Sequence, residues 1–205
     1  MTQTVTFTEL GPAEFRRAIS RFIAVYTAAM NPQERLLAGR EAILDRHAAN
    51  PGFRALAAAA GPVLAGFTYG FHGAPGQWWH DIVASALTFS SAPGAGTWLT
   101  DSFEVAELHV LPAYQGGGIG RELLTRLTSG RSERTAVLST ADTESRARRL
   151  YRGVGFTDLL TGFRFSGGEP PYAVMGATLP LRSAREGASV PEPPRSPRSP
   201  RPSSW

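Results

Sequence analysis

The sequence predicts an α+β fold, a mixed α/β arrangement in which strands and helices of one domain pack around a shared core. The chain has 205 residues, of which 42% are hydrophobic, enough for one domain with a substantial core. Apolar residues alternate in several short segments, as in strands, and recur every three to four positions in others, as in helices. A hairpin-like region precedes a central strand–loop–helix unit, which is typical of the α+β order.

The first half is predicted to form a strand, two helices and a hairpin. Residues 5–10 (VTFTEL) alternate as a strand does, and residues 11–30 carry an apolar stripe at helical spacing. A proline near the start predicts a second helix over residues 32–49, because proline fits the first helical turn. Residues 53–60 and 62–71 flank a Gly-Pro turn and predict a hairpin.

The second half continues the alternation around a central strand, SFEVAELHV. Its apolar patterns predict helices over 76–88, 118–129 and 142–154, and strands over 102–110, 134–140, 155–165 and 172–181.

Residues 182–205 differ from the rest, since proline, serine and arginine dominate and few apolar side chains are present. We expect a disordered tail that is either inert or docks a partner through its RSPRSPRP repeat. The tail carries a net charge of +3 out of +4 for the whole chain, so the remainder is nearly neutral. That distribution argues against a nucleic-acid-binding domain, despite the high isoelectric point.

Several residue types are missing, and their absence excludes whole classes of site. The chain has no cysteine, so disulfides, thiolate metal sites and a cysteine nucleophile are excluded. It has no lysine, so it lacks a Walker lysine and a lysine Schiff base. The four histidines show no metal-ligand spacing, and we expect no metal. With no apolar run of membrane length and no signal-like start, we expect no membrane contact and a cytoplasmic location.

The segment QGGGIGR, residues 115–121, lies between the central strand and a helix. Glycines leave the amides at a helix N-terminus bare, which suits a phosphate or diphosphate, and Arg121 adds a cationic contact. A purely structural turn is the alternative. The spacing G-x-G-x-G differs from the dinucleotide fingerprint, and a P-loop would need lysine. A different diphosphate-containing ligand is therefore favoured.

Two motifs in order resemble one family. HVLPAYQGGGIGRELL is similar to the acyl-CoA signature of the GNAT superfamily of N-acetyltransferases, and ARRLYRGVGF is similar to the family's fourth-helix motif. The resemblance covers residues 5–181, which we expect to form one N-acetyltransferase domain. It implies the GNAT fold: a twisted mixed sheet of six to seven strands, splayed between the fourth and fifth, with four to five flanking helices.

The resemblance implies acetyl-CoA as co-substrate. Leu108 and Val110 would offer backbone groups to the pantetheine arm, and an amide near Val110 would polarise the thioester carbonyl. Many members carry a cofactor-contacting asparagine where this chain has Glu144, so that contact does not carry over, and Thr143 and Ser145 are the candidates to replace it. The diphosphate would be held by Gln115, Gly116, Gly117, Gly118, Ile119, Gly120 and Arg121.

The resemblance also implies roles for an acid and a base. Glu107 is the preferred general base and Glu104 the alternative; strict strand alternation places them on opposite faces unless a bulge intervenes. Either glutamate could instead be a solvated or salt-bridged strand residue. Tyr151 stands at the general-acid position, or else packs under the cofactor. Without cysteine, we expect direct transfer in a ternary complex.

The acceptor would be a primary amine of a small molecule, peptide or protein. Tyr26, Trp79 and His80 are candidate acceptor-binding residues, with Trp78 and Asp81 beside them. The tryptophan pair could equally anchor a helix or cover a homodimer surface. Two other functions remain open: a catalytically silent acyl-CoA-binding sensor or interaction module, and an arginine-rich adaptor acting through the tail.

Overall fold

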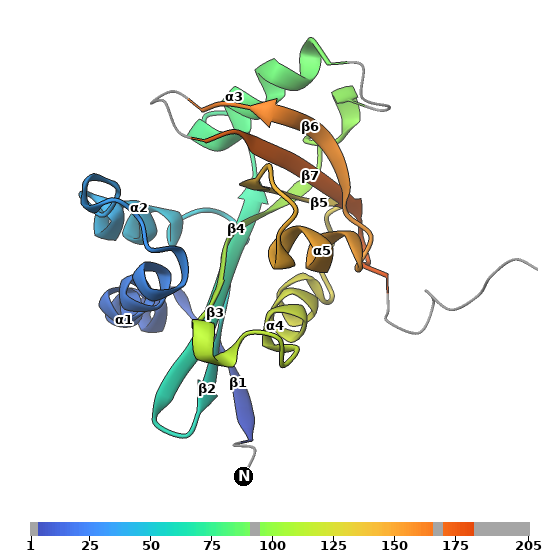
Figure 1. Cartoon of the computed structure of the whole chain (residues 1–205). Coiled ribbons are helices and arrows are strands. Elements are labelled where there is room, and N and C mark those ends of the chain that lie inside the picture. The colour runs from blue at the N-terminus through green and yellow to red at the C-terminus, as the bar shows by residue number, and fades with distance from the viewer. Residues whose placement is uncertain (1–3, 91–94, 166–169, 183–205) are drawn as a thin grey trace, which may run out of the picture.

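The computed structural model describes residues 4–90, 95–165 and 170–182, and these form one seven-stranded mixed sheet with five α-helices. The sheet order is β1-β2-β3-β4-β5-β7-β6 (Figure 1). The strands are β1 Val5–Leu10, β2 Arg54–Ala60, β3 Val63–Gly73, β4 Ser102–Val110, β5 Thr135–Ala141, β6 Thr157–Phe163 and β7 Tyr172–Thr178. The helices are α1 Pro12–Met30, α2 Arg40–His47, α3 Trp78–Thr88, α4 Ile119–Thr128 and α5 Arg146–Arg152, with short 3-10 turns η1 Glu34–Leu36, η2 Ala95–Thr97 and η3 Pro112–Tyr114.

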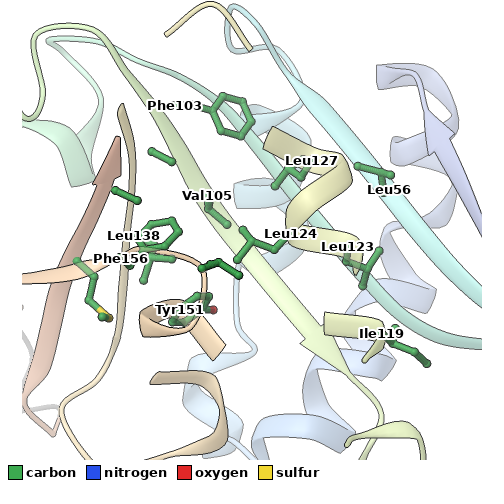
Figure 2. Packing of buried hydrophobic residues seen from close by; sticks show 14 of the residues in the cluster. Leu56, Phe103, Val105, Ile119, Leu123, Leu124, Leu127, Leu138, Tyr151 and Phe156 are labelled. Carbon is green, nitrogen blue, oxygen red and sulfur yellow. The ribbon is translucent and has the colours of Figure 1, made fainter. Parts of the chain in front are cut away.

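Helices cover both faces of the sheet. On one face, α4 and α5 enclose a core that includes Leu123, Leu124 and Tyr151 (Figure 2). On the other, α1 and α2 pack over β2 and β3, while α3 packs over β5 and β7. Figure 1 shows the α1–α2 pair and the α4–α5 pair on opposite sides of β3 and β4. This layering matches the predicted mixed fold.

The sheet opens at its centre. Strands β4 and β5 are parallel, and along their described lengths they pair only from Ser102 to Glu104 on β4 and from Thr135 to Val137 on β5. Both strands continue beyond this point, so they diverge with no ladder between them. The predicted splay between the fourth and fifth strands is therefore present.

Strand β4 contains a bulge just after the sheet opens. Tyr69 of β3 faces Glu107, whereas the next residue, Gly70, faces Val105. Ala106 is thus an extra residue on β4, and the alternation of its side chains shifts by one from that point.

Two predicted helices are shorter than expected. The segment 32–49 was predicted as one helix, but it holds η1, a turn and then α2. Gly39 adopts a left-handed conformation with φ of 75° directly before α2, which interrupts the helix there. The segment 142–154 becomes helical only at Arg146, because the Ser145 hydroxyl accepts from the amide of Arg148 and caps α5. The predicted tail, apart from Arg182, lies outside the described residues.

Candidate active site

The glycine-rich loop leads directly into α4. Gly116 and Gly118 have φ values of 87° and 85°, a region that other residues seldom adopt. A Cβ at either position would meet no atom within 4 Å, so these glycines are required by the backbone path rather than by crowding. Gln115 donates from Nε2 to the carbonyl of Val110 at 3.0 Å and ties the loop to the end of β4.

The amides of this loop point to an anion site. Within the described ranges, no carbonyl or side chain accepts a hydrogen bond from the amides of residues 116–121. These amides stand at the N-terminus of α4, where the helix dipole also favours negative charge. The arrangement fits the diphosphate predicted from the sequence.

A cavity of about 490 Å³ extends from this loop through the open part of the sheet. Ala29 and Met30 reach it from α1, and Leu150 and Tyr151 reach it from α5 on the opposite face. It is therefore bounded from both sides of the sheet, beside the part of β4 that no longer pairs with β5. The full lining comprises Ala29, Met30, Leu108, His109, Val110, Tyr114, Gln115, Gly116, Gly118, Gly120, Arg121, Arg146, Ala147, Arg149, Leu150 and Tyr151.

Three arginines line the cavity near the glycine loop: Arg121, Arg146 and Arg149. Within the described residues, none of them forms a salt bridge with a carboxylate. The other two arginines of α5 differ, since Arg148 pairs with two aspartates and Arg152 pairs with an aspartate and a glutamate. Unpaired guanidinium groups beside bare amides make this end of the cavity electropositive.

Tyr151 approaches the cavity from the α4–α5 face. It is buried beside Phe156, and Figure 2 shows it among the apolar side chains of this core. Burial and the negative charge of Glu107 both raise its pKa, so the phenol stays protonated at neutral pH.

The bulge places both candidate glutamates on the same face. Glu104 stands opposite Phe71 and Glu107 stands opposite Tyr69 on β3, and both of these aromatic rings belong to the core under α1 and α2. Strict alternation, which predicted opposite faces, is therefore wrong here, because Ala106 inserts one residue between them.

Glu107 is held tightly by two side chains, those of Arg40 and His109. Its Oε1 accepts from Arg40 and its Oε2 is bonded to Nε2 of His109. Burial raises the pKa of Glu107, but the His109 hydrogen bond and the charges of His109, Arg40 and His47 outweigh burial and lower it overall. Glu107 is ionised at neutral pH and lies next to the cavity without being among its lining residues.

Glu104 is in a different state. It is 5% exposed, its Oε2 has no hydrogen-bond partner among the described residues, and it does not line the cavity. Burial raises its pKa to about 8. The two glutamates on one face therefore differ in charge at neutral pH: Glu107 is ionised and Glu104 is mostly protonated.

Of the three predicted acceptor residues, the structure brings Tyr26 to the site. The guanidinium of Arg40 lies 3.4 Å from the centre of its ring, and the ring of His109 meets it edge-on at 5.1 Å. Trp79 instead donates to Ser139 at 3.1 Å and packs in the core under α3. His80 bonds to Asp81 and lines a separate cavity of about 350 Å³.

The predicted acyl-CoA contacts mostly gather at the cavity. Leu108, Val110, Gln115, Gly116, Gly118, Gly120 and Arg121 all line it. Ile119 is buried in the core and Gly117 is not among the lining residues, although both contribute amides at the start of α4. Thr143 is exposed in the turn before α5 and does not line the cavity.

Four residues at the site were not singled out from the sequence: Arg40, His109, Arg146 and Arg149. The sequence does hold a signal for His109. It lies two positions after Glu107 in the same predicted strand, and residues two apart in a regular strand lie on the same face. Arg40 had none, because its contact with Glu107 joins residues 67 positions apart.

Comparison with known proteins gives a consistent picture. The family model for the acetyltransferase (GNAT) domain matches residues 81–158. A GCN5-like protein acetyltransferase of Mycobacterium tuberculosis is 46% identical over 125 residues, which cover 58% of this chain and 60% of that protein.

Solved structures agree in fold. The ribosomal-protein-S18-alanine N-acetyltransferase of Escherichia coli aligns with a TM-score of 0.57 at 16% identity, covering 88% of this chain and 97% of that one. The NatC complex bound to Gag peptide and CoA aligns with a TM-score of 0.57 at 15% identity, covering 85% of this chain and 98% of that one. In the described part of the chain, no helix is long and apolar enough to span a membrane, and no group of three potential ligands could hold a metal.

Proposed function

We propose that this chain, which belongs to the GNAT family of acetyltransferases, moves an acetyl group from acetyl-CoA to a primary amine by direct attack in a ternary complex. One observation carries the proposal: a single cavity is lined from both faces of the sheet beside the end of β4 that has left β5. The glycine loop and unpaired arginines lie toward one face, and the Glu107–His109 pair lies toward the other.

Acetyl-CoA would bind on the α4–α5 side. The bare amides from Gly116 to Arg121 would hold the diphosphate, and the three unpaired arginines would neutralise the phosphates. Leu108 and Val110 lie on the part of β4 that has left β5, so their backbone groups are available to an extended pantetheine arm. The apolar wall from Leu150 and Tyr151 would exclude water from the thioester.

The amine would arrive from the α1–α2 side. An alkylammonium with a pKa near 10 must lose a proton before it can attack. On this side, ionised Glu107 is bonded to His109, which lines the cavity, so groups able to accept a proton stand beside it. The nitrogen attacks the thioester carbon, the C–S bond breaks, and the chain supplies no cysteine for an acyl-enzyme intermediate.

Tyr151 would stabilise the departing sulfur. A phenol with a raised pKa is protonated and donates a hydrogen bond, yet it is a weaker acid than a thiol with a pKa near 8.5. The phenol thus supports the thiolate as the C–S bond breaks, and the sulfur takes its final proton by exchange with solvent.

We propose a peptide or protein amine as the first acceptor to test, because the relative that is 46% identical over its matched stretch is named a protein acetyltransferase. The assay measures thiol release from acetyl-CoA with a lysine-containing peptide, a peptide with only a free N-terminus, spermidine and an aminoglycoside. Since the chain has no lysine, acetylation of its own lysine side chains cannot contribute a background.

We expect thiol release with at least one amine, and Tyr151→Phe should lower kcat about ten- to hundredfold while the Kd for acetyl-CoA changes little. Measurable acetyl-CoA binding with no thiol release from any amine would contradict an enzyme and favour the silent acyl-CoA sensor.

A further inference from the structure

His109 lies where the cavity meets the charged cluster on the α1–α2 face. It is near the end of β4, lines the cavity, and has a side chain that is 12% exposed. Its ring packs edge-on against Tyr26 at 5.1 Å and against Phe67 at 5.6 Å, and its Nε2 is bonded to Glu107. The imidazole is therefore fixed in orientation from three directions.

The bond to Glu107 decides which nitrogen carries the hydrogen. An ionised carboxylate only accepts, so Nε2 must donate, and in neutral imidazole the lone pair is then on Nδ1. Within the described residues Nδ1 forms no hydrogen bond, and it is not one of the fully buried side-chain atoms that lack a partner. A basic nitrogen that is not fully buried thus remains on a ring that lines the cavity.

Glu107 is less suited to take a proton itself. Both of its oxygens are engaged, one by Arg40 and one by His109, and it does not line the cavity. Arg40 is in turn held against the ring of Tyr26, so the ion pair is fixed rather than free to swing away. The surrounding positive charge also lowers the pKa of Glu107, which makes it a weak base.

We infer that His109 is the catalytic base: Nδ1 takes a proton from the acceptor ammonium, and Glu107 is the positioning residue that holds the ring and stabilises the imidazolium. This inference rests on the proposed acetyl transfer. The ammonium gives one proton to His109, and the neutral nitrogen attacks the thioester carbon. The new C–N bond replaces the C–S bond, and the acylated nitrogen gives up its second proton as the thiolate gains one. His109 then releases its proton to solvent, so each turnover yields one amide, one thiol and one proton.

The test compares His109→Gln with the unmodified protein in the thiol-release assay, using the panel amine with the highest turnover. Glutamine can still donate to Glu107 but has no basic lone pair. We expect kcat to fall about a hundredfold with the KM for acetyl-CoA within about threefold. The matched control is His72→Gln, because His72 bonds to Glu133 far from this cavity, and its kcat should stay within about twofold.

A second acceptor separates base catalysis from a structural role. The β-fluorinated analogue of the same amine is less basic and needs less help in losing its proton. The deficit of His109→Gln should shrink to less than about tenfold with this analogue, whereas a merely structural defect would be the same for both amines. In the unmodified protein, kcat/KM should decrease on the acid side at the same pH for both acceptors. This acid limb then reports the protonation of a group on the enzyme and not of the amine. This measurement needs no variant and holds even if His109→Gln folds poorly.

Activity of His109→Gln within threefold of the unmodified protein, or an acid limb that moves with the amine, would overturn the role of His109 and leave the acetyl transfer intact. Failure of the unmodified protein to release thiol with any amine would instead overturn the proposed function, and the role of His109 with it.

Discussion

One extra residue in β4 determines which side chains can cooperate. Ala106 shifts the alternation so that Glu104, Glu107 and the β3 aromatic residues opposite them share one face. The sequence predicted that both glutamates lie on the central strand, but alternation alone placed them apart. A bulge depends on the pairing between β3 and β4. The sequence therefore allowed a bulge as an alternative but did not show its position.

Glu104 makes the stability of the protein depend on pH. In the folded state it keeps its proton up to about pH 8, whereas an exposed glutamate titrates near 4.5. Folding therefore takes up a proton between these values, and the free energy of unfolding falls as the pH rises from about 4.5 to 8. We expect Glu104→Gln to remove this loss and to raise the free energy of unfolding at pH 8.5 by about 2–4 kcal/mol, measured by urea denaturation.

Glu133 is the matched control, because its pKa is shifted in the opposite direction to that of Glu104. Burial raises its pKa, but its hydrogen bonds with Arg131 and His72 and the charge of Arg131 lower it overall. Such a carboxylate contributes stability above its unfolded pKa and loses it as the pH falls. Glu133→Gln should therefore destabilise the protein at pH 8.5. Two results would contradict the raised pKa of Glu104. One is a Glu104→Gln variant that is also destabilised at pH 8.5, and the other is a variant whose free energy of unfolding still falls between about pH 4.5 and 8.

Among the secondary-structure elements, α5 carries two kinds of arginine: two that form salt bridges and two that line the cavity. Arg148 and Arg152 pair with acidic side chains around the start of α5 and β6, whereas Arg146 and Arg149 line the cavity and have no such partner among the described residues. The sequence identified the helix through its family motif and assigned a role to Tyr151 only. Which arginines are already neutralised depends on carboxylates brought close by folding, which spacing along one helix does not reveal.

We expect Arg146→Gln and Arg149→Gln to raise the Kd for CoA about threefold each, and the double variant about tenfold, because two unpaired charges at the phosphate end are lost. Binding of 3′-dephospho-CoA, measured in parallel, shows whether these arginines also select for the 3′-phosphate. If they do, the Kd values for CoA and 3′-dephospho-CoA should differ less in the double variant than in the unmodified protein.

Arg152→Gln is the matched control on the same helix, since it removes the same charge from a side chain that is paired and does not line the cavity. Its Kd for CoA should stay within about twofold. Equal weakening by Arg152→Gln and the cavity variants would mean that net charge matters rather than position.

The elements that the sequence predicted best are those with strong local signals. The apolar stripe of α1, the alternating strands and the glycine loop before α4 all appear where expected. The predicted helix over 32–49 was wrong in extent, because a left-handed Gly39 breaks it and places Arg40 at the start of α2, facing Glu107. The segment does have a helical pattern, but the conformation of one residue, Gly39, prevents a single continuous helix.

At the scale of the whole molecule, the site exists because the sheet is open. The lining of the cavity comes from α1, β4, the glycine loop, α4 and α5, which span more than a hundred positions in the sequence. The two family motifs predicted the glycine loop and the Tyr151 helix that line the cavity, since both motifs are contiguous. The acceptor side could not be predicted in the same way. Trp79 and His80 were candidates from their types alone, and both lie on α3, where Trp79 packs against the core and His80 lines another cavity.

The proposed function requires the left-handed glycines to hold bare amides toward a cavity that takes the phosphates of acetyl-CoA. Gly118 and Gly130 both have positive φ, 85° and 68°, and a Cβ at either would meet nothing within 4 Å, but only Gly118 lines the cavity. An alanine at either position therefore imposes a similar backbone strain on folding, while only one adds an atom beside the ligand.

Isothermal titration calorimetry of acetyl-CoA with the unmodified protein, Gly118→Ala and Gly130→Ala shows whether the glycine loop binds these phosphates. We predict clear binding by the unmodified protein, binding at least about tenfold weaker for Gly118→Ala, and unchanged binding for Gly130→Ala. No heat of binding with the unmodified protein, or equal affinities for the two variants, would contradict it.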